Sequence, residues 1–375
     1  MKKVVIAIDS FKGCLPSVEA GKAAAEGIRS VYPECEVICL PIADGGEGML
    51  DVLIMATNGQ EVPISAHDPL MRWRNTYYSI SENGETAFIE MASISGLPLV
   101  PPERRNPMLT TTYGTGEIIR DALERGCRNF IIGIGGSATN DAGLGMLQAL
   151  GFRFSDKEGK EVGTGRGEVL IKVAHIDSTC VHPALNSCRF TVACDVQNPF
   201  YGPEGAAYVF APQKGANRKM VEALDAGLQN FAEVIRHTTG KDISHHPGAG
   251  AAGGMGGSLL AFLNAELKPG IQLMLEALDF SNKIKSADLI ITGEGKADRQ
   301  TLMGKVPSGI LAEARKQNIP VILLAGNIED SDELQQAGFE GVFSVNPPFI
   351  SLEEAMRPEV ARKNIQQTVE SICKK

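Results

Sequence analysis

The chain has 375 residues, 43% of them hydrophobic and 22% charged, which is the composition of a globular protein large enough for two domains. Its formal net charge of −9 excludes a general basic surface, and with it a nucleic-acid-binding or membrane-surface protein. The eight cysteines are scattered without a Cys-x-x-Cys pair, so we expect reduced thiols instead of disulfides or zinc ligands. The apolar run at the amino terminus is too short for a signal peptide and no window approaches a membrane span, which predicts a cytoplasmic protein.

The amino-terminal segment alternates strand and helix signals. Residues 3–8 are predicted to form a buried strand, 16–31 a helix with one apolar face, and 36–40 a second strand. This order predicts a βαβ unit and a parallel sheet, in which ligands collect beyond the carboxyl ends of the strands. Polar loops that contain glycine stand at those ends, at 9–13 and 43–48.

Residues 61–90 change character, which predicts that the chain leaves the first domain here. Short segments at 61–65, 73–80 and 86–90 are separated by turn signals and predict strands. A helix is predicted for 117–125, just before the most informative stretch of the chain.

That stretch covers residues 129–145. An apolar strand runs into Gly133-Ile-Gly-Gly-Ser-Ala-Thr-Asn-Asp141, and a helix is predicted at 144–150. Strand, glycine loop and helix form a phosphate-binding arrangement, because glycines let the backbone approach an anion and the helix start offers unpaired N–H groups. The carboxylate of Asp141 would repel a bare pyrophosphate, so it favours a polyphosphate that is bridged by Mg²⁺.

Two other interpretations of this loop stay open. Residues 133–138 fit the dinucleotide fingerprint G-x-G-x-x-G/A, and 152–156 could supply the second strand with its terminal acid, so a nicotinamide enzyme is a rival. A turn whose Asn140 and Asp141 only cap the next helix is the simpler alternative, although it leaves the preceding glycines unexplained.

The later part of the chain again delivers polar residues from strands. A strand at 190–193 leads into Asp195, and a strand at 288–292 leads into a glycine-containing loop. Apolar residues at helical spacing between 220 and 235 predict a core-facing helix. The glycines of 247–257 lack a preceding apolar strand, so they are more simply a loop that opens a helix at 258–263 than a second dinucleotide fingerprint.

The βαβ pattern of the first residues returns near the carboxyl end, with a helix at 308–316, a strand at 320–325 and a terminal helix from 353. We therefore expect one discontinuous domain, 1–60 plus 285–375, interrupted by an inserted domain at 61–284. Acids recur beside glycine at strand ends, and lysines recur in similar loops, which suits phosphoryl transfer. The acids are Asp9, Asp44, Glu47, Asp141, Asp195, Glu294 and Asp298, and the lysines are Lys12, Lys214, Lys296 and Lys305.

These motifs together resemble the bacterial type I glycerate kinase family over essentially the whole chain. The matching segments are 9–13, 43–48, 135–141, 194–199, 212–215, 248–254, 292–295 and the residues Asp298, Gln300, Gly304 and Lys305. The resemblance implies ATP-dependent phosphorylation of glycerate with Mg²⁺, usually to 2-phosphoglycerate. It also implies two α/β domains, a Rossmann-like one with a parallel sheet and an inserted one, with the active site in the cleft between them. The chain departs from the family at Ile8, Cys14, Met71 and Ala142, and it loses no matched acid or lysine.

Residue patterns and resemblance together suggest roles. Asp195 is the expected general base with Asp44 in reserve, and Lys12 is expected to act on the transferred phosphate. ATP is expected to contact Gly135, Gly136, Ser137, Thr139, Asn140, Lys214, Gly250, Gly253, Gly254 and Lys305. Glycerate is expected to contact Ser10, Lys12, Arg105 and Asn198. Mg²⁺ is expected on Asp141, Glu294 and Asp298.

The expected partners are the small molecules glycerate and ATP, without nucleic acid or membrane, and a homodimer is compatible with the sequence. The enzyme rival is an NAD(P)-dependent dehydrogenase of small acids, which would bind NAD(P) and turn over no ATP. The non-enzyme rival is a sugar-acid sensor, since α/β domains also suit ligand sensing.

Overall fold

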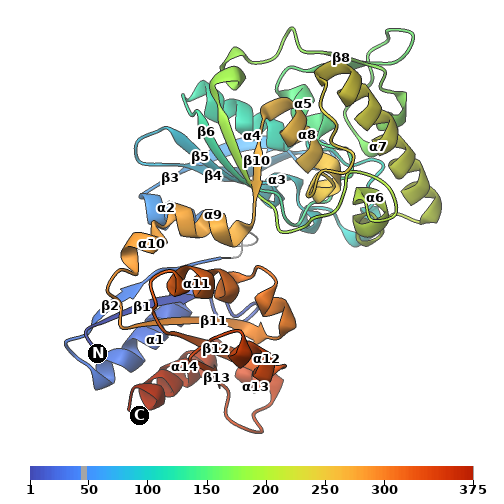
Figure 1. Ribbon diagram of the computed structural model, residues 1–375. Coiled ribbons are helices and arrows are strands. Elements are labelled where there is room, and N and C mark those ends of the chain that lie inside the picture. The colour runs from blue at the N-terminus through green and yellow to red at the C-terminus, as the bar shows by residue number, and fades with distance from the viewer. Residues whose placement is uncertain (44–48, 375) are drawn as a thin grey trace. The chain divides into compact units, whose positions relative to one another are not determined.

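The computed structural model describes residues 1–43 and 49–374 (Figure 1). The chain forms two compact units. Unit 1 comprises Met1–Val52 and Ile271–Lys375, and unit 2 comprises Leu53–Gly270, so one unit is discontinuous and the other is inserted into its sequence. The changeovers lie at 52–53 and 270–271, whereas the sequence-based division placed them at 60–61 and 284–285. Among the described residues, no helix combines the length and the apolar character needed to cross a membrane.

Unit 1 is built on a parallel sheet of five strands in the order β13-β12-β11-β1-β2. The strands are β1 (Lys3–Ile8), β2 (Glu36–Cys39), β11 (Leu289–Ala297), β12 (Val321–Ile328) and β13 (Gly341–Ser344). The predicted βαβ opening and the return of this pattern near the carboxyl end are confirmed. Strand β1, which lies between β11 and β2, is buried on both faces, as expected for its continuous apolar run.

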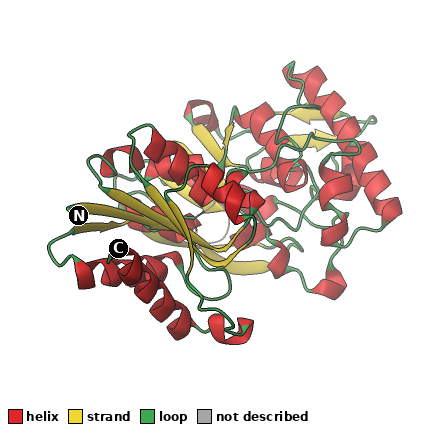
Figure 2. Ribbon diagram, turned by 60° about the horizontal axis from the view of Figure 1, so that its bottom comes forward, coloured by secondary structure: helices red, strands yellow, loops and turns green. Residues whose placement is uncertain are grey.

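Helices cover both faces of this sheet, and Figure 1 shows α1 (Ser17–Val31) and α14 (Pro358–Cys373) on the face opposite α11 (Val306–Arg315). Figure 2, with strands in yellow, shows the same layering near the N label. Alternate residues of β1 and β11 form one core with α1 and α14. The remaining helices of this part of the chain are α2 (Met49–Thr57), α9 (Gly270–Ala277), α10 (Phe280–Lys283), α12 (Ser331–Gln336) and α13 (Leu352–Ala355).

Unit 2 contains a mixed sheet of six strands in the order β10-β9-β6-β5-β4-β3. β10, β9, β6 and β5 run parallel to one another, and β4 pairs antiparallel with both β5 and β3. The antiparallel strands agree with the short strands and turns predicted after residue 60. The strands are β3 (Gln60–His67), β4 (Trp73–Ile80), β5 (Thr86–Glu90), β6 (Asn129–Gly133), β9 (Arg189–Ala193) and β10 (Glu266–Lys268). A separate pair, β7 (Arg153–Ser155) and β8 (His175–Asp177), is antiparallel.

The helices of unit 2 pack on its sheet through one large core. They are α3 (Ala92–Ser95), α4 (Tyr113–Glu124), α5 (Leu144–Ala149), α6 (Ala206–Phe210), α7 (Arg218–Thr239) and α8 (Met255–Leu263). The apolar stripe predicted for α7 is confirmed as core, since Leu224, Leu228 and Phe231 are fully buried. The glycine segment before α8 does open a helix, as predicted.

Three predicted elements differ from the structure. The strand expected to end at 292 continues to Ala297 because β12 pairs with it along its whole length. Helix α4 begins four residues before the predicted start at 117. The terminal helix is broken before Pro358, since proline at the first helical position cannot donate the backbone hydrogen bond that a continuous helix needs.

Candidate active site

The loop between β6 and α5 lies at the carboxyl end of a parallel strand, where ligands of α/β sheets bind. Gly135 and Gly136 are exposed at its start, and Gly136 adopts a φ of 71°, which a residue with a side chain disfavours. Ser137 is 7% exposed, whereas Thr139 and Asn140 are fully buried. The loop thus offers accessible backbone at one end and buried polar side chains at the other.

The structure contradicts the dinucleotide interpretation of this loop. A fingerprint glycine loop opens directly into a helix, but α5 begins at Leu144, well after Ala138. The second strand that this interpretation needs is also missing from the sheet. β7 pairs only with β8, antiparallel, so Asp156 does not end a parallel neighbour of β6.

Lys214 is the cation of the loop. Its Nζ donates hydrogen bonds to Ser137 Oγ at 2.7 Å and to the Thr139 carbonyl at 2.6 Å, and the residue is only 2% exposed. Among the described residues, no carboxylate forms an ion pair with it. Burial lowers the pKa of Lys214 to about 7, although the negative charge of Asp141 acts in the opposite direction. Burial disfavours the charged form of this amine in the free protein, and an anionic ligand that binds beside it would favour the charged form again.

The position of Lys214 is fixed by the turn that follows it. Lys214 ends the short 3-10 helix Pro212–Lys214, and Gly215 then takes a φ of 96°. A Cβ at Gly215 would lie 2.3 Å from the carbonyl oxygen of Arg105, so glycine is needed for this close approach. The backbone of Arg105 therefore lies beside the Lys214 turn, and the Arg105 Nε donates a long hydrogen bond of 3.4 Å to the Val100 carbonyl.

We expect the burial of Lys214 to appear in the pH dependence of stability. Between pH 7 and its ordinary value of 10.5, Lys214 is neutral in the folded chain and charged in the unfolded chain, so the unfolded state binds more protons. The free energy of unfolding of the wild type should therefore rise with pH relative to that of Lys214→Met. Urea denaturation between pH 6.5 and 9.5 measures this, with the exposed Lys219→Met as control; parallel curves for all three proteins would contradict the shift.

Three buried polar atoms beside Lys214 have no hydrogen-bond partner within the described part of the chain. They are Thr139 Oγ1 and both amide atoms of Asn140. Leaving such groups unpaired costs about 1–3 kcal/mol each, and they are uncommon outside functional sites and water sites. The hydroxyl of Thr139 and the amide of Asn140 are therefore able to form hydrogen bonds with a ligand.

Two further loops pack onto this one. A Cβ at Gly253 would lie 2.1 Å from the Thr139 carbonyl oxygen, and one at Gly250 would lie 2.2 Å from the Pro199 carbonyl oxygen. The Gly250 N–H donates to the Asn198 carbonyl at 3.0 Å. The structure thus places the predicted ATP-binding residues Gly253 and Gly254 against the loop that carries Thr139 and Asn140, and Gly250 against Asn198 and Pro199.

Substitution of Gly253 should destabilise this arrangement. Gly253→Ala combines a φ of 67° with the collision against Thr139, so we expect a loss of about 3 kcal/mol or more in the free energy of unfolding. Gly159→Ala is the matched control, because Gly159 has a φ of 79° with nothing within 4 Å, and it should cost about 1 kcal/mol. Denaturant unfolding measures both, and equal losses would show that the close approach is unimportant.

Asp141 was predicted to hold Mg²⁺, but its contacts are those of an internal hydrogen-bond acceptor. The residue is fully buried, and its carboxylate accepts from the Thr112 N–H and Oγ1 at 2.8 Å each and from the N–H groups of Gly143 and Gly145. Burial raises its pKa despite these donors. The carboxylate therefore ties the loop to the starts of α4 and α5, and we assign it no metal.

Asp195 lies two residues after the end of β9 and is exposed. Its Oδ1 accepts a hydrogen bond from the Gly270 N–H at 2.8 Å, which fixes the direction of the carboxylate. Asn198 lies three residues further on, and its Nδ2 donates to the Glu204 carbonyl at 2.8 Å. An exposed and oriented carboxylate at the end of a parallel strand can accept a proton from a substrate.

A second group of predicted residues lines one pocket of about 410 Å³ in unit 1. β1 and β11 are parallel neighbours, with Ile8 opposite Gly293, so the residues that follow them lie side by side. Asp9, Ser10, Lys12, Glu294, Lys296 and Lys305 all line this pocket. The predicted residue Asp44 and its loop lie outside the described residues.

Glu294 is one of two buried acids that line this pocket, the other being Asp9. Glu294 is 7% exposed, its Oε1 accepts from Thr301 Oγ1 at 2.6 Å, and its Oε2 lies 3.7 Å from Lys305 Nζ. Burial raises the pKa of Glu294, against the opposing effects of Thr301 and Lys305. At Asp298, burial also acts to raise the pKa, but the Gln300 N–H and nearby lysines outweigh it and the pKa is lowered. Among the described residues, no three metal-ligating side chains gather into a ready-made metal site.

Sequence reasoning missed the residues that orient these acids. Thr112 and Thr301 hold Asp141 and Glu294 through hydroxyl hydrogen bonds. A run of threonines at 110–112 just before a helix was a visible signal for the first, because hydroxyl residues near helix starts often bond to neighbouring loops.

A glycine loop with a buried cation, an oriented carboxylate and a pocket of acids and lysines defines, on this α/β fold, a phosphotransferase. Comparison with known proteins agrees. A model of the glycerate kinase family matches residues 4–375. The chain is 47% identical to the glycerate 2-kinase of Escherichia coli (strain K12) over 356 residues, which cover 95% of this chain and 93% of that protein. It is 46% identical to the glycerate kinase of Bacillus subtilis (strain 168) over 372 residues, 99% of this chain and 97% of that protein.

A solved structure agrees as well. A crystal structure of a Salmonella typhimurium LT2 protein described as glycerate kinase 2 superposes with a TM-score of 0.90 at 43% identity, over 100% of this chain and 97% of that one. The chain belongs to the glycerate kinase family.

Proposed function

We propose that the protein transfers the γ-phosphate of ATP to the 2-hydroxyl of D-glycerate, giving 2-phosphoglycerate and ADP. The observation that carries this is Lys214, a buried cation without a paired carboxylate among the described residues, bonded to Ser137 and Thr139 of a glycine loop. Phosphoryl transfer needs charge stabilisation more than covalent chemistry, and this loop supplies it.

The phosphates of ATP would bind along the loop of residues 135–140. The exposed backbone of Gly135 and Gly136 lets an anion approach, and Ser137 and Lys214 lie next to it. The unpaired amide of Asn140 gains partners when the loop adjusts around its ligand, which offsets its cost in the free protein. Gly253 and Gly254 pack against this loop and Gly250 against Pro199, and Lys305 remains our proposal for a further contact of ATP.

Asp195 would serve as the general base. Its carboxylate accepts the proton of the 2-hydroxyl while that oxygen bonds to the γ-phosphorus and ADP leaves. The backbone hydrogen bond from Gly270 keeps the carboxylate in place through this step. Glycerate's own carboxylate requires a cation or N–H donors, for which we propose Arg105, Lys12, Ser10 and Asn198.

Mg²⁺ would be held mainly by the nucleotide, with help from Glu294 and Asp298. Mg²⁺ on nucleotides commonly takes only one or two carboxylates, together with phosphate oxygens and water, which fits the lack of a larger cluster among the described acids. When bound, Mg²⁺ neutralises charge that develops on the phosphate oxygens. Thr301 and Lys305 orient Glu294 for this role. Use of ATP would place the reaction in the cytoplasm.

Phosphorus NMR tests the proposal directly. Incubation with D-glycerate, ATP and Mg²⁺ should convert the γ-phosphate signal into a single phosphomonoester whose coupling to one proton marks the 2-position. Coupling to two protons would place the phosphate at the 3-position and contradict the regiochemistry. Persistence of ATP, with binding of NAD(P) in its place, would overturn the kinase assignment in favour of a dehydrogenase, and glycerate binding without any turnover would favour a sensor.

A further inference from the structure

The pocket of unit 1 has a second side that the proposed chemistry does not use. Apolar side chains line it together with the acids and lysines, and they come from the loops after β1 and β13, from α13 and the residue after it, and from α14; we call them the apolar wall. They are Phe11, Val345, Leu352, Ala355, Met356 and Ala361. A pocket that is lined by both charged and apolar side chains suits a ligand that has a charged part and an apolar part.

Some side chains of the apolar wall are buried and others are exposed to solvent. Val345 and Ala355 are 3% and 7% exposed, whereas Leu352 is 77% and Met356 38% exposed. Exposure of large apolar side chains to water is unfavourable, and a ligand that covers them lowers the free energy. The exposed side chains Leu352 and Met356 thus indicate a ligand with a flat or compact apolar surface.

Two asparagine side chains add hydrogen-bonding groups at the edge of this wall. Asn346 is held in place, because its Nδ2 donates to the Gly326 carbonyl at 2.7 Å and its Oδ1 accepts from Asn364 Nδ2 at 3.2 Å. Asn327, on the exposed end of β12, makes only a long contact of 3.4 Å to Glu329. Carboxamides present a donor and an acceptor together, which matches the edge of a nucleobase.

Of the substrates of the proposed reaction, only the adenine of ATP combines an apolar surface with hydrogen-bonding groups on its edge. Glycerate is small and polar throughout, so an apolar wall gives it nothing. Adenine is flat and apolar on its faces and carries donors and acceptors on its edge. We propose that the wall formed by Phe11, Val345, Leu352, Ala355, Met356 and Ala361 is the subsite for the adenine of the nucleotide, an inference that rests on the proposed function.

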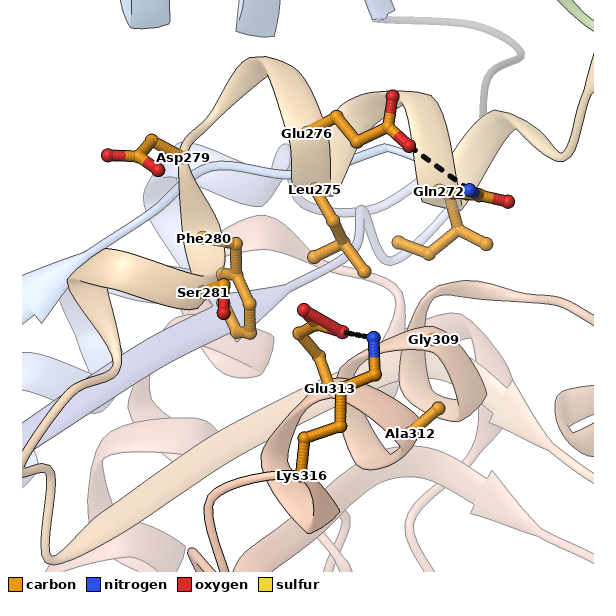
Figure 3. Close-up of a pocket in the computed structure, with 11 residues that line it drawn as sticks. Gln272, Leu275, Glu276, Asp279, Phe280, Ser281, Gly309, Ala312, Glu313 and Lys316 are labelled. Atoms are coloured by element: carbon orange, nitrogen blue, oxygen red, sulfur yellow. Dashed lines mark hydrogen bonds and ion pairs between the residues drawn. The ribbon is translucent and has the colours of Figure 1, made fainter.

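A second hollow among the described residues of unit 1 has the wrong charge for a nucleotide. It measures about 600 Å³ and lies between α9–α10 and α11. Figure 3 shows the carboxylates of Glu276, Asp279 and Glu313 around it, with Lys316 paired to Glu313 at 2.5 Å. Its acids would repel phosphate groups, whereas Lys12, Lys296 and Lys305 stand in the pocket with the apolar wall.

The test compares three probes on the full chain by calorimetry: ADP, adenosine and inorganic tripolyphosphate. Leu352→Ser and Met356→Ser remove apolar surface at exposed positions, so we expect the fold to survive. Each should weaken ADP and adenosine binding about tenfold, and the double variant about a hundredfold. Tripolyphosphate binding and the KM for D-glycerate should stay within about twofold, since neither ligand touches the wall.

Met303→Ser is the matched control. Met303 is 76% exposed, almost as much as Leu352, but does not line the pocket, so its removal should leave ADP binding unchanged. Unchanged ADP binding in the double variant, or equal weakening of ADP and tripolyphosphate, would overturn the adenine subsite. Loss of ADP binding by Met303→Ser would overturn it as well, because the effect would then not be specific to the wall.

Hydrogen exchange on the unaltered protein gives an independent measurement. ADP and adenosine should slow exchange in residues 345–356, and tripolyphosphate should not; protection elsewhere only would contradict the proposal. These readouts do not depend on turnover. If the protein binds ADP at this wall but does not phosphorylate glycerate, the adenine subsite stands and the proposed function is wrong. If the protein phosphorylates glycerate but substitutions in the wall do not change ADP binding, the proposed function stands and the adenine subsite is wrong.

Discussion

Lys214→Met is expected to lower kcat/KM for ATP by about two to three orders of magnitude, the loss measured when one preorganised charge-stabilising donor is removed from an active site. The residue supplies the only described cation that bonds to the glycine loop of unit 2, through Ser137 Oγ and the Thr139 carbonyl. Its loss removes both the charge next to the phosphates and the support beneath the loop. Steady-state kinetics with saturating D-glycerate measure the effect.

Two variants separate these contributions. Lys219→Met removes a neighbouring lysine that is exposed on α7, and it should behave as wild type. Ser137→Ala keeps the cation but removes one of its two partners, so it should cost less than Lys214→Met, about tenfold. Full activity in Lys214→Met, with the fold intact by circular dichroism, would remove Lys214 from the site.

Asp195→Asn is expected to lower kcat by about two to four orders of magnitude while ADP still binds with unchanged affinity, because a carboxamide cannot accept the proton of the glycerate hydroxyl. The structure leaves the carboxylate exposed at the end of β9 and fixed by the Gly270 N–H. An amide oxygen can accept the same hydrogen bond, so the local fold should persist. Steady-state turnover measures the loss of kcat, calorimetry measures the affinity for ADP, and circular dichroism measures whether the fold persists.

Asp177→Asn is the matched control for this variant. Asp177 in unit 2 also accepts a backbone N–H through Oδ1 at 2.8 Å, from Thr179, but it belongs to the small β7–β8 pair. It should leave kcat unchanged. Near-normal turnover of Asp195→Asn, or an equal loss in both variants, would exclude Asp195 as the base.

The sequence predicted elements whose signals are local. β1 and β9 are short apolar runs with polar residues soon after them, and α7 carries an apolar stripe at helical spacing, so the ends of each lie within about four residues of the prediction. The glycine loop was recognised for the same reason. The dinucleotide alternative could be rejected only once the pairing of the strands was known. It requires β7 to be a parallel neighbour of β6, and tertiary packing decides with which strand a segment as short as β7 pairs.

Roles that depend on distant contacts could not be predicted. Asp141 beside glycines has the same local pattern whether it binds a metal or accepts backbone N–H groups, and the deciding partner, Thr112, lies 29 residues earlier. Glu294 was expected in a loop, but pairing with β12, with Glu294 opposite Ala325, overrides the low strand preference of its neighbouring glycines. The apolar wall at Leu352 and Met356 has no sequence motif, since it exists only where α13 meets the ends of the strands.

The central claim is that the buried polar atoms around Lys214 exist to receive phosphate. A crystal structure with Mg²⁺ and a non-hydrolysable ATP analogue tests it most directly. The account predicts phosphate oxygens within hydrogen-bonding distance of Lys214 Nζ, Ser137 Oγ and the backbone of residues 135–137, with the Asn140 amide now partnered. Phosphates bound elsewhere, with Lys214 and Asn140 in their present contacts, would contradict it.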